Sequence, residues 1–150
     1  MKVVLQRVSK ASVTIDKKIV ASIKSGILIL IGIVDEDSSE DILWLTKKIS
    51  NLRIFNDKNE VMNNSLLDIN GEVIVVSQFT LQASTKKGSR PSYIKAAKPA
   101  VAIPLYEKFV SELEKELGKK VQTGQFGADM NVELINDGPV TIVIDSKNKI

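Results

Sequence analysis

An uninterrupted apolar run, GILILIGIV, occupies residues 26–34 and constrains the fold more than any other part of the chain. A membrane-spanning helix needs roughly 20 such residues, so this run is far too short to cross a bilayer. Successive residues of a strand point to opposite faces of a sheet, and a strand that is apolar at every position is buried on both faces. The run therefore predicts a central strand with a packed layer on each side.

Shorter runs rich in Val and Ile lie on either side of this segment and end at polar turns. The sequence predicts further strands at 2–8, 11–16, 19–24, 72–81, 130–135 and 140–145. A turn at Lys17 and Lys18 would join the strand at 11–16 to the strand at 19–24, which predicts a meander at the N-terminus. At residues 136–139, NDGP, the Asp-Gly pair favours a hairpin turn between the last two strands.

Two segments have the residue spacing of amphipathic helices. In the first, Ser38 or Ser39 can cap the N-terminus, and Glu40 and Asp41 suit the first turn. Its apolar positions are Ile42, Leu45, Ile49 and Leu52. In the second, Pro104 lies near the start and Gly118 follows the last turn. Its apolar positions are Leu105, Phe109, Leu113 and Leu117.

These elements predict the fold class. No repeat, linker or composition change divides residues 1–150, so we expect a single domain. Strands outnumber helices, and the helices come singly. The sequence therefore predicts a mixed α/β fold of the α+β kind, with a curved, mostly antiparallel sheet or barrel and two main helices laid against it.

The composition limits the available chemistry. The chain contains no His and no Cys, which leaves no disulfide, no thiolate or imidazole metal ligand and none of the usual bases for a Ser or Thr nucleophile. The carboxylates of Asp35, Glu36 and Asp37 precede a helix, where we expect them to be solvated. No glycine spacing matches a nucleotide-binding fingerprint, so neither a metal nor a cofactor is predicted. The N-terminus lacks the apolar core of a signal peptide, which favours the cytoplasm.

The stretch VVSQFTL, residues 75–81, runs from an apolar strand into two hydroxyls, those of Ser77 and Thr80. Two interpretations remain open from the pattern alone. The hydroxyls can satisfy backbone groups at a strand end, or they can serve a reaction that needs no side-chain base. A Ser-Lys pair is a third, weaker possibility, because no recognisable lysine spacing surrounds Ser77.

Pro139 follows Gly138 directly at the start of the last predicted strand. A hairpin turn explains the Asp-Gly pair before it, but it does not explain a proline that removes one donor from the strand ladder. An X-Pro bond also adopts the cis form in about 5–6% of cases in folded proteins. The pattern alone thus leaves a turn and a special backbone feature both open.

A basic block lies between Glu72 and Glu107, where no acidic residue occurs. Its cations are Lys86, Lys87, Arg90, Lys95 and Lys98. Three of them belong to STKKGSR, a polar loop that is either simply solvated or in contact with nucleic-acid phosphates. The charge run does not decide between these interpretations.

Taken in order, the motifs VSQFTL, GSRPSY, GQFGADM and NDGPVT resemble those of D-aminoacyl-tRNA deacylases of the D-tyrosyl-tRNA deacylase type. The resemblance extends over about residues 1–145. It implies a homodimer of compact β/β/α subunits that hydrolyses the ester between a D-amino acid and the 3′-terminal adenosine of tRNA. Two small departures are Tyr93, where Phe is common, and the polar tail SKNKI.

The resemblance also implies roles for particular residues. The SQxT motif corresponds to Ser77, Gln78 and Thr80, and a Gly-cis-Pro motif corresponds to Gly138 and Pro139, which would reach into the site of the partner subunit. Two further correspondences are Arg7, which would hold that dipeptide, and Phe126, an aromatic near the adenosine.

From these correspondences we expect a mechanism without an enzymic base. Backbone amides near Phe79 and Thr80 would stabilise the oxyanion, and the 2′-hydroxyl of the substrate would help to move the proton. Lys86, Lys87 and Arg90 are the candidate tRNA-phosphate contacts. Steric exclusion by the dipeptide would reject L-amino acids and leave glycyl-tRNA as a substrate. The alternatives are a non-catalytic RNA-binding barrel and a generic esterase.

Overall fold

The structure, a computed structural model, describes all residues from 1 to 150. Strand β1 (Lys2–Ile15) pairs with three other strands of a six-stranded sheet. The first half of β1 pairs with β3 (Gly26–Gly32), the second half pairs with β2 (Lys18–Ile23), and β8 (Asn131–Asp145) runs along its other edge, all antiparallel. Two parallel strands continue the sheet beyond β3, first β6 (Glu72–Ser77) and then β7 (Gln122–Thr123). A separate pair, β4 (Phe55–Asn56) and β5 (Met62–Asn64), forms a small hairpin.

The sheet curves until its two ends nearly meet. The side chain of Gln122 in β7 accepts a hydrogen bond of 2.7 Å from the backbone N–H of Ser22 in β2, and it donates one of 2.7 Å to the Ser22 carbonyl. These bonds join the two outer strands of the path β2-β1-β3-β6-β7. The predicted mixed fold with a curved, barrel-like sheet and two helices is confirmed.

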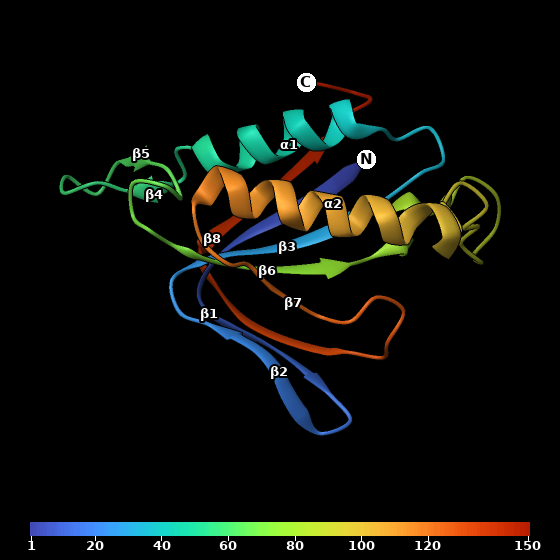
Figure 1. Cartoon of the computed structure of the whole chain (residues 1–150), viewed down its shortest axis with the longest axis horizontal. Helices are drawn as coiled ribbons and strands as arrows, with labels where there is room; N and C mark the ends of the chain where they lie inside the picture. The colour runs from blue at the N-terminus through green and yellow to red at the C-terminus, as the bar shows by residue number, and fades with distance from the viewer.

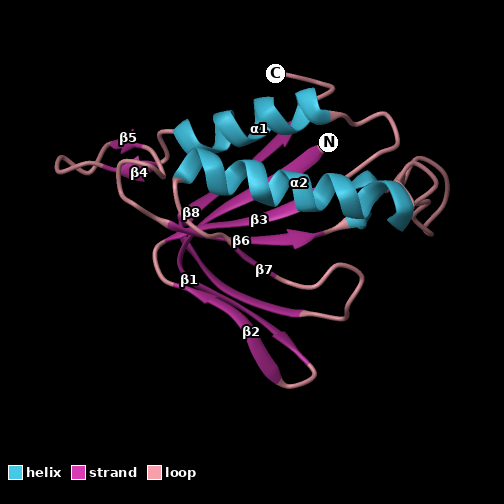
Figure 2. Ribbon diagram, viewed as in Figure 1, coloured by secondary structure: helices cyan, strands magenta, loops and turns pink.

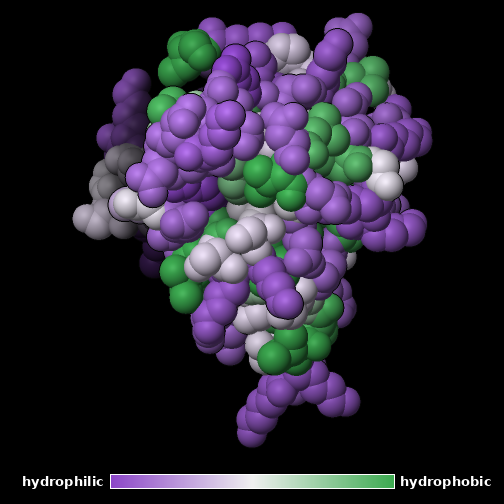
Figure 3. All heavy atoms as spheres, turned by 90° about the vertical axis from the view of Figure 1, so that its left-hand side faces the viewer, coloured by the Kyte–Doolittle hydropathy of each residue, from purple (hydrophilic) through white to green (hydrophobic).

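Two helices cover one face of the sheet. They are α1 (Ser39–Asn51) and α2 (Pro99–Leu117), and they lie side by side (Figures 1 and 2). The surface at the end of the molecule where α1 stops is largely hydrophilic (Figure 3). No helix is both long enough and apolar enough to cross a membrane.

The central strand is buried on both faces, as the run at residues 26–34 predicts. Ile27, Ile29 and Ile31 pack into the core beneath the helices, whereas Leu28 belongs to a second apolar cluster on the opposite face. At about 1.5–3 kcal/mol for each fully buried aliphatic side chain, these clusters are the main source of stability. The carboxyl ends of β3 and β6 are thereby fixed at the same edge of the sheet, since the two strands are parallel.

The predictions for β1, for the turn after it and for β8 each differ from the structure. The predicted strands 2–8 and 11–16 form one continuous strand, because polar Ser9 and Lys10 are simply exposed within β1. The turn after it lies at Asp16 and Lys17, both at positive φ, one residue earlier than expected. The predicted hairpin at NDGP is absent. Residues on both sides of it pair antiparallel with β1, so the chain never reverses direction there.

Both helices form where their spacing predicts, with one shifted boundary. Ser38 is the N-cap of α1, and its backbone N–H donates a 2.8 Å hydrogen bond to Asp41. The start of α2 is Pro99, so Pro104 lies inside the helix, contrary to the prediction. Asp37 was expected to be solvated but is buried, because it accepts hydrogen bonds from the Val34 N–H and the Met1 amino group.

Candidate active site

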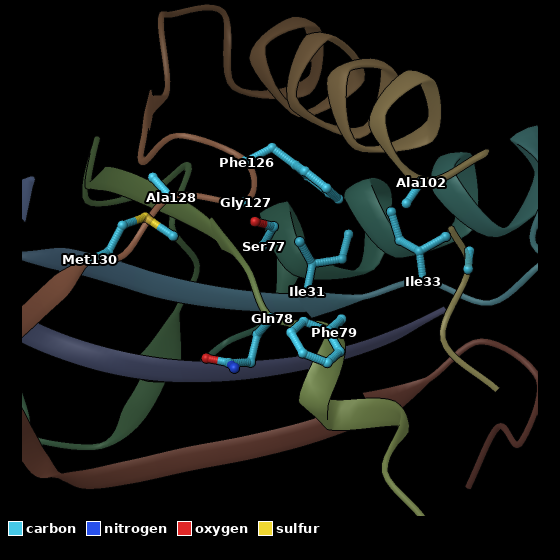
Figure 4. Close-up of a pocket in the computed structure, with 11 residues that line it drawn as sticks. Ile31, Ile33, Ser77, Gln78, Phe79, Ala102, Phe126, Gly127, Ala128 and Met130 are labelled. Carbon is cyan, nitrogen blue, oxygen red and sulfur yellow. The ribbon is translucent and has the colours of Figure 1, made fainter. Parts of the chain in front are cut away.

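A pocket of about 230 Å³ lies at the edge of the sheet where β3 and β6 end. Its lining is mainly apolar and includes Ile31 from β3, Ala102 from the first turn of α2, and Phe126 with Met130 from the segment before β8. In Figure 4, Phe126 approaches the pocket from above and Phe79 from below, with Ile31 between them. Such a site can take a flat apolar group and present it to the few polar atoms at its rim.

The SQFT segment lies at the rim of this pocket, and its Ser77 and Gln78 bring polar side chains to the lining. Ser77 is the last residue of β6, and the backbone N–H of Gln78 donates a 2.7 Å hydrogen bond to the Ile31 carbonyl. Ser77, Gln78 and Phe79 all line the pocket, whereas Thr80 lies one residue beyond it. The structure thus brings these candidate residues together with Phe126.

The expected strand 72–81 is too long, since β6 stops at Ser77. A 3₁₀ turn, η1 (Phe79–Gln82), follows it, and Gln78 is the residue before that turn. The first N–H groups of a helical turn have no partner within the turn, so η1 leaves the amides of Phe79 and Thr80 available as donors. The predicted amide donors therefore come from a turn, not from a strand end.

Thr80 is held by its neighbour in the motif. The side-chain amide of Gln78 donates a 2.5 Å hydrogen bond to Oγ1 of Thr80. Because this oxygen already accepts a hydrogen bond, the hydroxyl hydrogen of Thr80 can point toward another acceptor. The side chain of Thr80 is thus oriented by Gln78, and no hydrogen bond joins it to a base.

Phe126 is fixed by a buried tyrosine that the sequence did not single out. Its ring meets Tyr106 edge to face, with ring centroids 5.7 Å apart. The Tyr106 hydroxyl donates a 3.1 Å hydrogen bond to the carbonyl of Val75 in β6. Burial raises the pKa of Tyr106 to about 12, against a smaller lowering by a hydrogen bond with Thr123, so the phenol stays protonated. Tyr106 therefore ties α2, β6 and the pocket wall together.

The candidate phosphate residues occupy an exposed loop that continues from η1. Ser84 and Ser92 exchange two backbone hydrogen bonds, of 2.8 and 2.9 Å, at the base of this loop. Lys86, Lys87 and Arg90 are exposed and take part in no ion pair. Beyond the loop, the ring of Tyr93 packs edge to face against the ring of Phe79, with ring centroids 5.1 Å apart. The cations thus lie in a loop whose far end contacts the rim of the pocket.

Arg7 and the Gly138-Pro139 dipeptide form a second cluster. Four residues of β8, 137–140, bulge outward opposite the single residue Arg7 of β1. The guanidinium of Arg7 donates hydrogen bonds to the Asp137 carbonyl, at 2.9 Å, and to the Ile54 carbonyl, at 2.7 Å. Asn136 closes the base of the bulge by accepting a 3.0 Å bond from the Val140 N–H.

The dipeptide at the tip of this bulge is exposed, and its peptide bond is cis. Gly138 has φ of 127°, and an added Cβ would lie 2.9 Å from Nη2 of Arg7, so only glycine fits. Neither Gly138 nor Pro139 lines the pocket of its own chain. Within this chain, the dipeptide and the residues that line the pocket are therefore separate.

No group of three or more His, Cys, Asp or Glu side chains is arranged to hold a metal ion. The pocket offers hydroxyl, amide and aromatic groups, which suit a polar organic substrate better than an ion.

Comparisons with known proteins identify the family of the chain. The family model described as D-Tyr-tRNA(Tyr) deacylase matches residues 4–145. The chain is 77% identical to the D-aminoacyl-tRNA deacylase of Flavobacterium psychrophilum over 99% of both chains. It is 66% identical to the protein of the same name from Flavobacterium johnsoniae, again over 99% of both chains. The chain belongs to the D-Tyr-tRNA(Tyr) deacylase family.

Solved structures extend the comparison. The chain is similar to the structure of a c-Myc DNA unwinding element binding protein, with a TM-score of 0.91 and 38% identity over 97% of this chain and 98% of the other. A probable eukaryotic D-amino acid tRNA deacylase shares the fold at 18% identity, with a TM-score of 0.82 over 95% of this chain and 97% of that one.

Sequence reasoning missed part of the site of this D-Tyr-tRNA(Tyr) deacylase family member. Ala128 and Met130 line the pocket and lie within GQFGADM, the motif in which only Phe126 was predicted as a site residue. Ala102 and Tyr106 belong to a helix whose spacing indicated only a core face. Their role depends on where α2 crosses β6, which spacing does not reveal.

Proposed function

We propose that the chain hydrolyses the ester bond of D-aminoacyl-tRNA, releasing the free D-amino acid and the tRNA, in the cytoplasm and without a cofactor. The observation that carries this proposal is the joining of the SQFT rim to an apolar pocket walled by Phe126. Family membership and the names of the relatives support it.

The 3′-terminal adenosine would occupy the pocket. A base can stack on the ring of Phe126, which Tyr106 holds in position, and base–aromatic stacking is worth about 1–3 kcal/mol. The ester carbonyl would then lie at the rim, beside Phe79 and Thr80. Lys86, Lys87 and Arg90 would contact phosphates of the tRNA, since the far end of their loop packs against Phe79 through Tyr93.

The chemical step would rest on electrostatic stabilisation. Amides of Phe79 and Thr80 would donate to the oxyanion that forms when water attacks the carbonyl, and one such donor typically contributes about 10²–10³ in rate. The Thr80 hydroxyl, oriented by Gln78, would position water or the carbonyl. The absence of His leaves proton transfer to the neighbouring 2′-hydroxyl of the substrate.

We further propose a homodimer with composite sites. Gly138 and Pro139 are exposed and lie apart from their own pocket, so they can reach the pocket of a second copy. Large apolar side chains on the outward face of the same strand, Ile135 and Val143, are 50% and 60% exposed, which is consistent with burial in an interface.

The dipeptide would provide chiral selection. Its carbonyls would hold the α-amino group, and its backbone would fill the space into which an L side chain points. A D side chain would project outward, so many D-amino acids would be accepted. Glycine has no side chain to exclude, and glycyl-tRNA would also be hydrolysed.

A deacylation assay with D-, L- and glycyl-tRNA tests the proposal. We expect rapid release of D-amino acids and glycine, with L-aminoacyl-tRNA left intact. Binding of tRNA without release of any amino acid would instead support a non-catalytic RNA-binding barrel. Hydrolysis of simple esters with covalent labelling by a serine-directed inhibitor would support a generic esterase.

A further inference from the structure

A second hollow, of about 440 Å³, lies on the outer surface of α1 near its C-terminal end. Its residues are Trp44, Lys47, Lys48, Asn51, Leu52 and Arg53. Trp44, Lys47, Lys48 and Asn51 share one helix face, because residues three and four apart are neighbours on a helix surface. We call this hollow, together with Lys149 of the C-terminal tail, the Trp44 surface.

Two ammonium groups converge on the single tryptophan of the chain. Nζ of Lys149 lies 4.5 Å from the centroid of the Trp44 ring, and Nζ of Lys48 lies 5.7 Å from it. Each contact is favourable by itself, and both place a cation against the indole ring. An anion that contacts either ammonium group would add a charge-assisted hydrogen bond to this cluster.

Two of the acids near this surface are already engaged, whereas Glu40, one helical turn before Trp44, and the C-terminal carboxylate beside Lys149 are not. Asp41 forms an ion pair of 2.8 Å with Lys147, and Asp68 accepts hydrogen bonds from Ser65. The charge of Arg53 helps to lower the pKa of Asp68, but the two side chains form no ion pair. Nε of Arg53 instead donates a 2.9 Å hydrogen bond to the Asn63 carbonyl. Lys47, Lys48 and Lys149 have no ion-pair partner. The surface therefore keeps a net positive charge around an aromatic ring.

The position of the Trp44 surface relative to the active site suggests what binds there. The active-site pocket lies beside the loop that enters α1, and the Trp44 surface lies at the other end of that helix. The 13 residues of α1 span about 20 Å. Figure 3 views this far end, and its upper part, where α1 lies, is predominantly hydrophilic.

We propose that the Trp44 surface binds the sugar-phosphate backbone of double-stranded RNA in the acceptor arm of the substrate tRNA. This inference rests on the proposed function, because it takes tRNA as the substrate. Proteins recognise RNA duplexes mainly through phosphates and 2′-hydroxyls, which Lys, Arg and Asn side chains can contact. A single-stranded 3′ end in the pocket places the duplex farther from the site, so a distant basic surface can contact it.

Trp44 itself provides the measurement, since no other tryptophan contributes to fluorescence. The probe is a blunt RNA duplex with an acceptor-stem sequence and no single-stranded 3′ end. We expect a saturable change in Trp44 fluorescence and an affinity that falls with salt. The double variant Lys47→Gln/Lys48→Gln should lower the log-log salt slope by about two units, at roughly 0.9 for each phosphate neutralised.

A matched control carries the same charge change elsewhere. Lys17→Gln/Lys18→Gln lies at the tip of the β1–β2 hairpin and should leave both affinity and slope unchanged. An equal loss in both double variants, or no fluorescence change while the duplex binds, would overturn the proposal. A full response to inorganic phosphate alone would also overturn it, because that would indicate a simple anion site. Thermal melting of each variant verifies that it is folded, and the wild-type titration stands independently of the variants.

A short substrate separates this proposal from the catalytic one. A D-aminoacyl ester of the 3′-terminal CCA trinucleotide contains no duplex, so the Lys47→Gln/Lys48→Gln variant should hydrolyse it at the wild-type rate. A reduced rate would contradict a role confined to the duplex. Failure of the wild-type protein to hydrolyse any D-aminoacyl ester would instead refute the proposed function and leave duplex binding to be judged by the fluorescence titration.

Discussion

Arg7 donates a hydrogen bond of 2.9 Å from Nε to the backbone carbonyl of Asp137, which lies 130 residues away in the sequence. The same guanidinium also binds the Ile54 carbonyl at 2.7 Å. Only 7% of Arg7 is exposed, so a single buried cation connects β1, the segment after α1 and the bulge that carries Gly138 and Pro139. The position of the dipeptide thus depends on a residue outside its own strand.

Replacing Arg7 tests this dependence. Arg7→Lys retains the charge but lacks the planar fork that reaches two carbonyls at once, so we expect a loss of roughly 1.5–3 kcal/mol in the free energy of unfolding. Discrimination between D- and L-aminoacyl-tRNA should weaken as the bulge loosens. Urea denaturation and paired deacylation assays measure the two effects. Lys10→Ala, at an exposed position of the same strand, should change neither quantity.

Thr80 provides the second prediction. If its hydroxyl only positions water or the carbonyl, Thr80→Ala should slow deacylation by a moderate factor, matching one hydrogen bond of about 0.5–1.5 kcal/mol, and Thr80→Ser should retain most activity. A substrate whose terminal adenosine is 2′-deoxy, charged at the 3′ position, should react far more slowly. Single-turnover kinetics with both substrates make the comparison.

An acyl-enzyme is the outcome that this mechanism forbids. A Thr80 nucleophile would need a base near neutral pH, but the reference pKa of a Lys side chain is ~10.4, those of Asp and Glu are ~4, and the chain has no His. Trapping radiolabelled D-amino acid on Thr80, or full turnover of the 2′-deoxy substrate, would show that the proton takes another route.

The third prediction concerns the exposed loop at 84–92. Lys86→Gln/Lys87→Gln should weaken tRNA binding and lower the log-log salt slope by roughly one unit for each phosphate that the loop no longer neutralises. The ratio of D to L hydrolysis should stay constant, because neither lysine lines the pocket. Filter binding across a salt series tests the first effect. Slopes equal to those of the wild type would mean that the loop is merely solvated.

The residue pattern correctly predicted the elements that are determined by residues close together in the sequence. The doubly buried strand at 26–34, the Ser38 cap and the apolar face of α1 follow from periodicity and capping, and the structure contains all three. Of the residues that the family resemblance singled out, Ser77, Gln78, Phe79 and Phe126 line one pocket, and Thr80 follows directly beyond it.

The wrong predictions lie where contacts with residues distant in the sequence determine the local structure. Asp-Gly before Pro139 has the residues of a hairpin turn, yet pairing with β1 on both sides keeps β8 running in one direction, and Arg7 holds the intervening bulge. Asp37 follows two other acids in a polar stretch, yet it is buried because the first and last segments of the chain meet beside it. No local pattern contains those pairings.

The last prediction concerns the pH dependence of stability at the start of α1. Burial acts to raise the pKa of Asp41, but hydrogen bonds from Lys147, Ser146 and the Ser38 backbone, with the charge of Lys147, outweigh it and hold that pKa well below its ordinary value. A carboxyl whose pKa is lowered by folding contributes stability above its unfolded pKa, near ~3.9, and loses it as the pH falls toward the folded value.

Asp41→Asn should therefore lower the free energy of unfolding at about pH 7 by roughly 1 kcal/mol, a typical value for a helix-capping interaction. The difference from wild type should shrink progressively once the pH falls below about 3.9, because the Asp41 carboxyl of the unfolded wild-type chain then binds a proton that the folded state does not, and this favours unfolding. Urea denaturation across a pH series measures both curves. Glu40→Gln, at an exposed neighbouring position without a hydrogen-bonding partner, should show only a small difference at every pH. A deficit for Asp41→Asn that stays constant down to about pH 2.5 would mean that the loss comes from packing, not from the charge of Asp41.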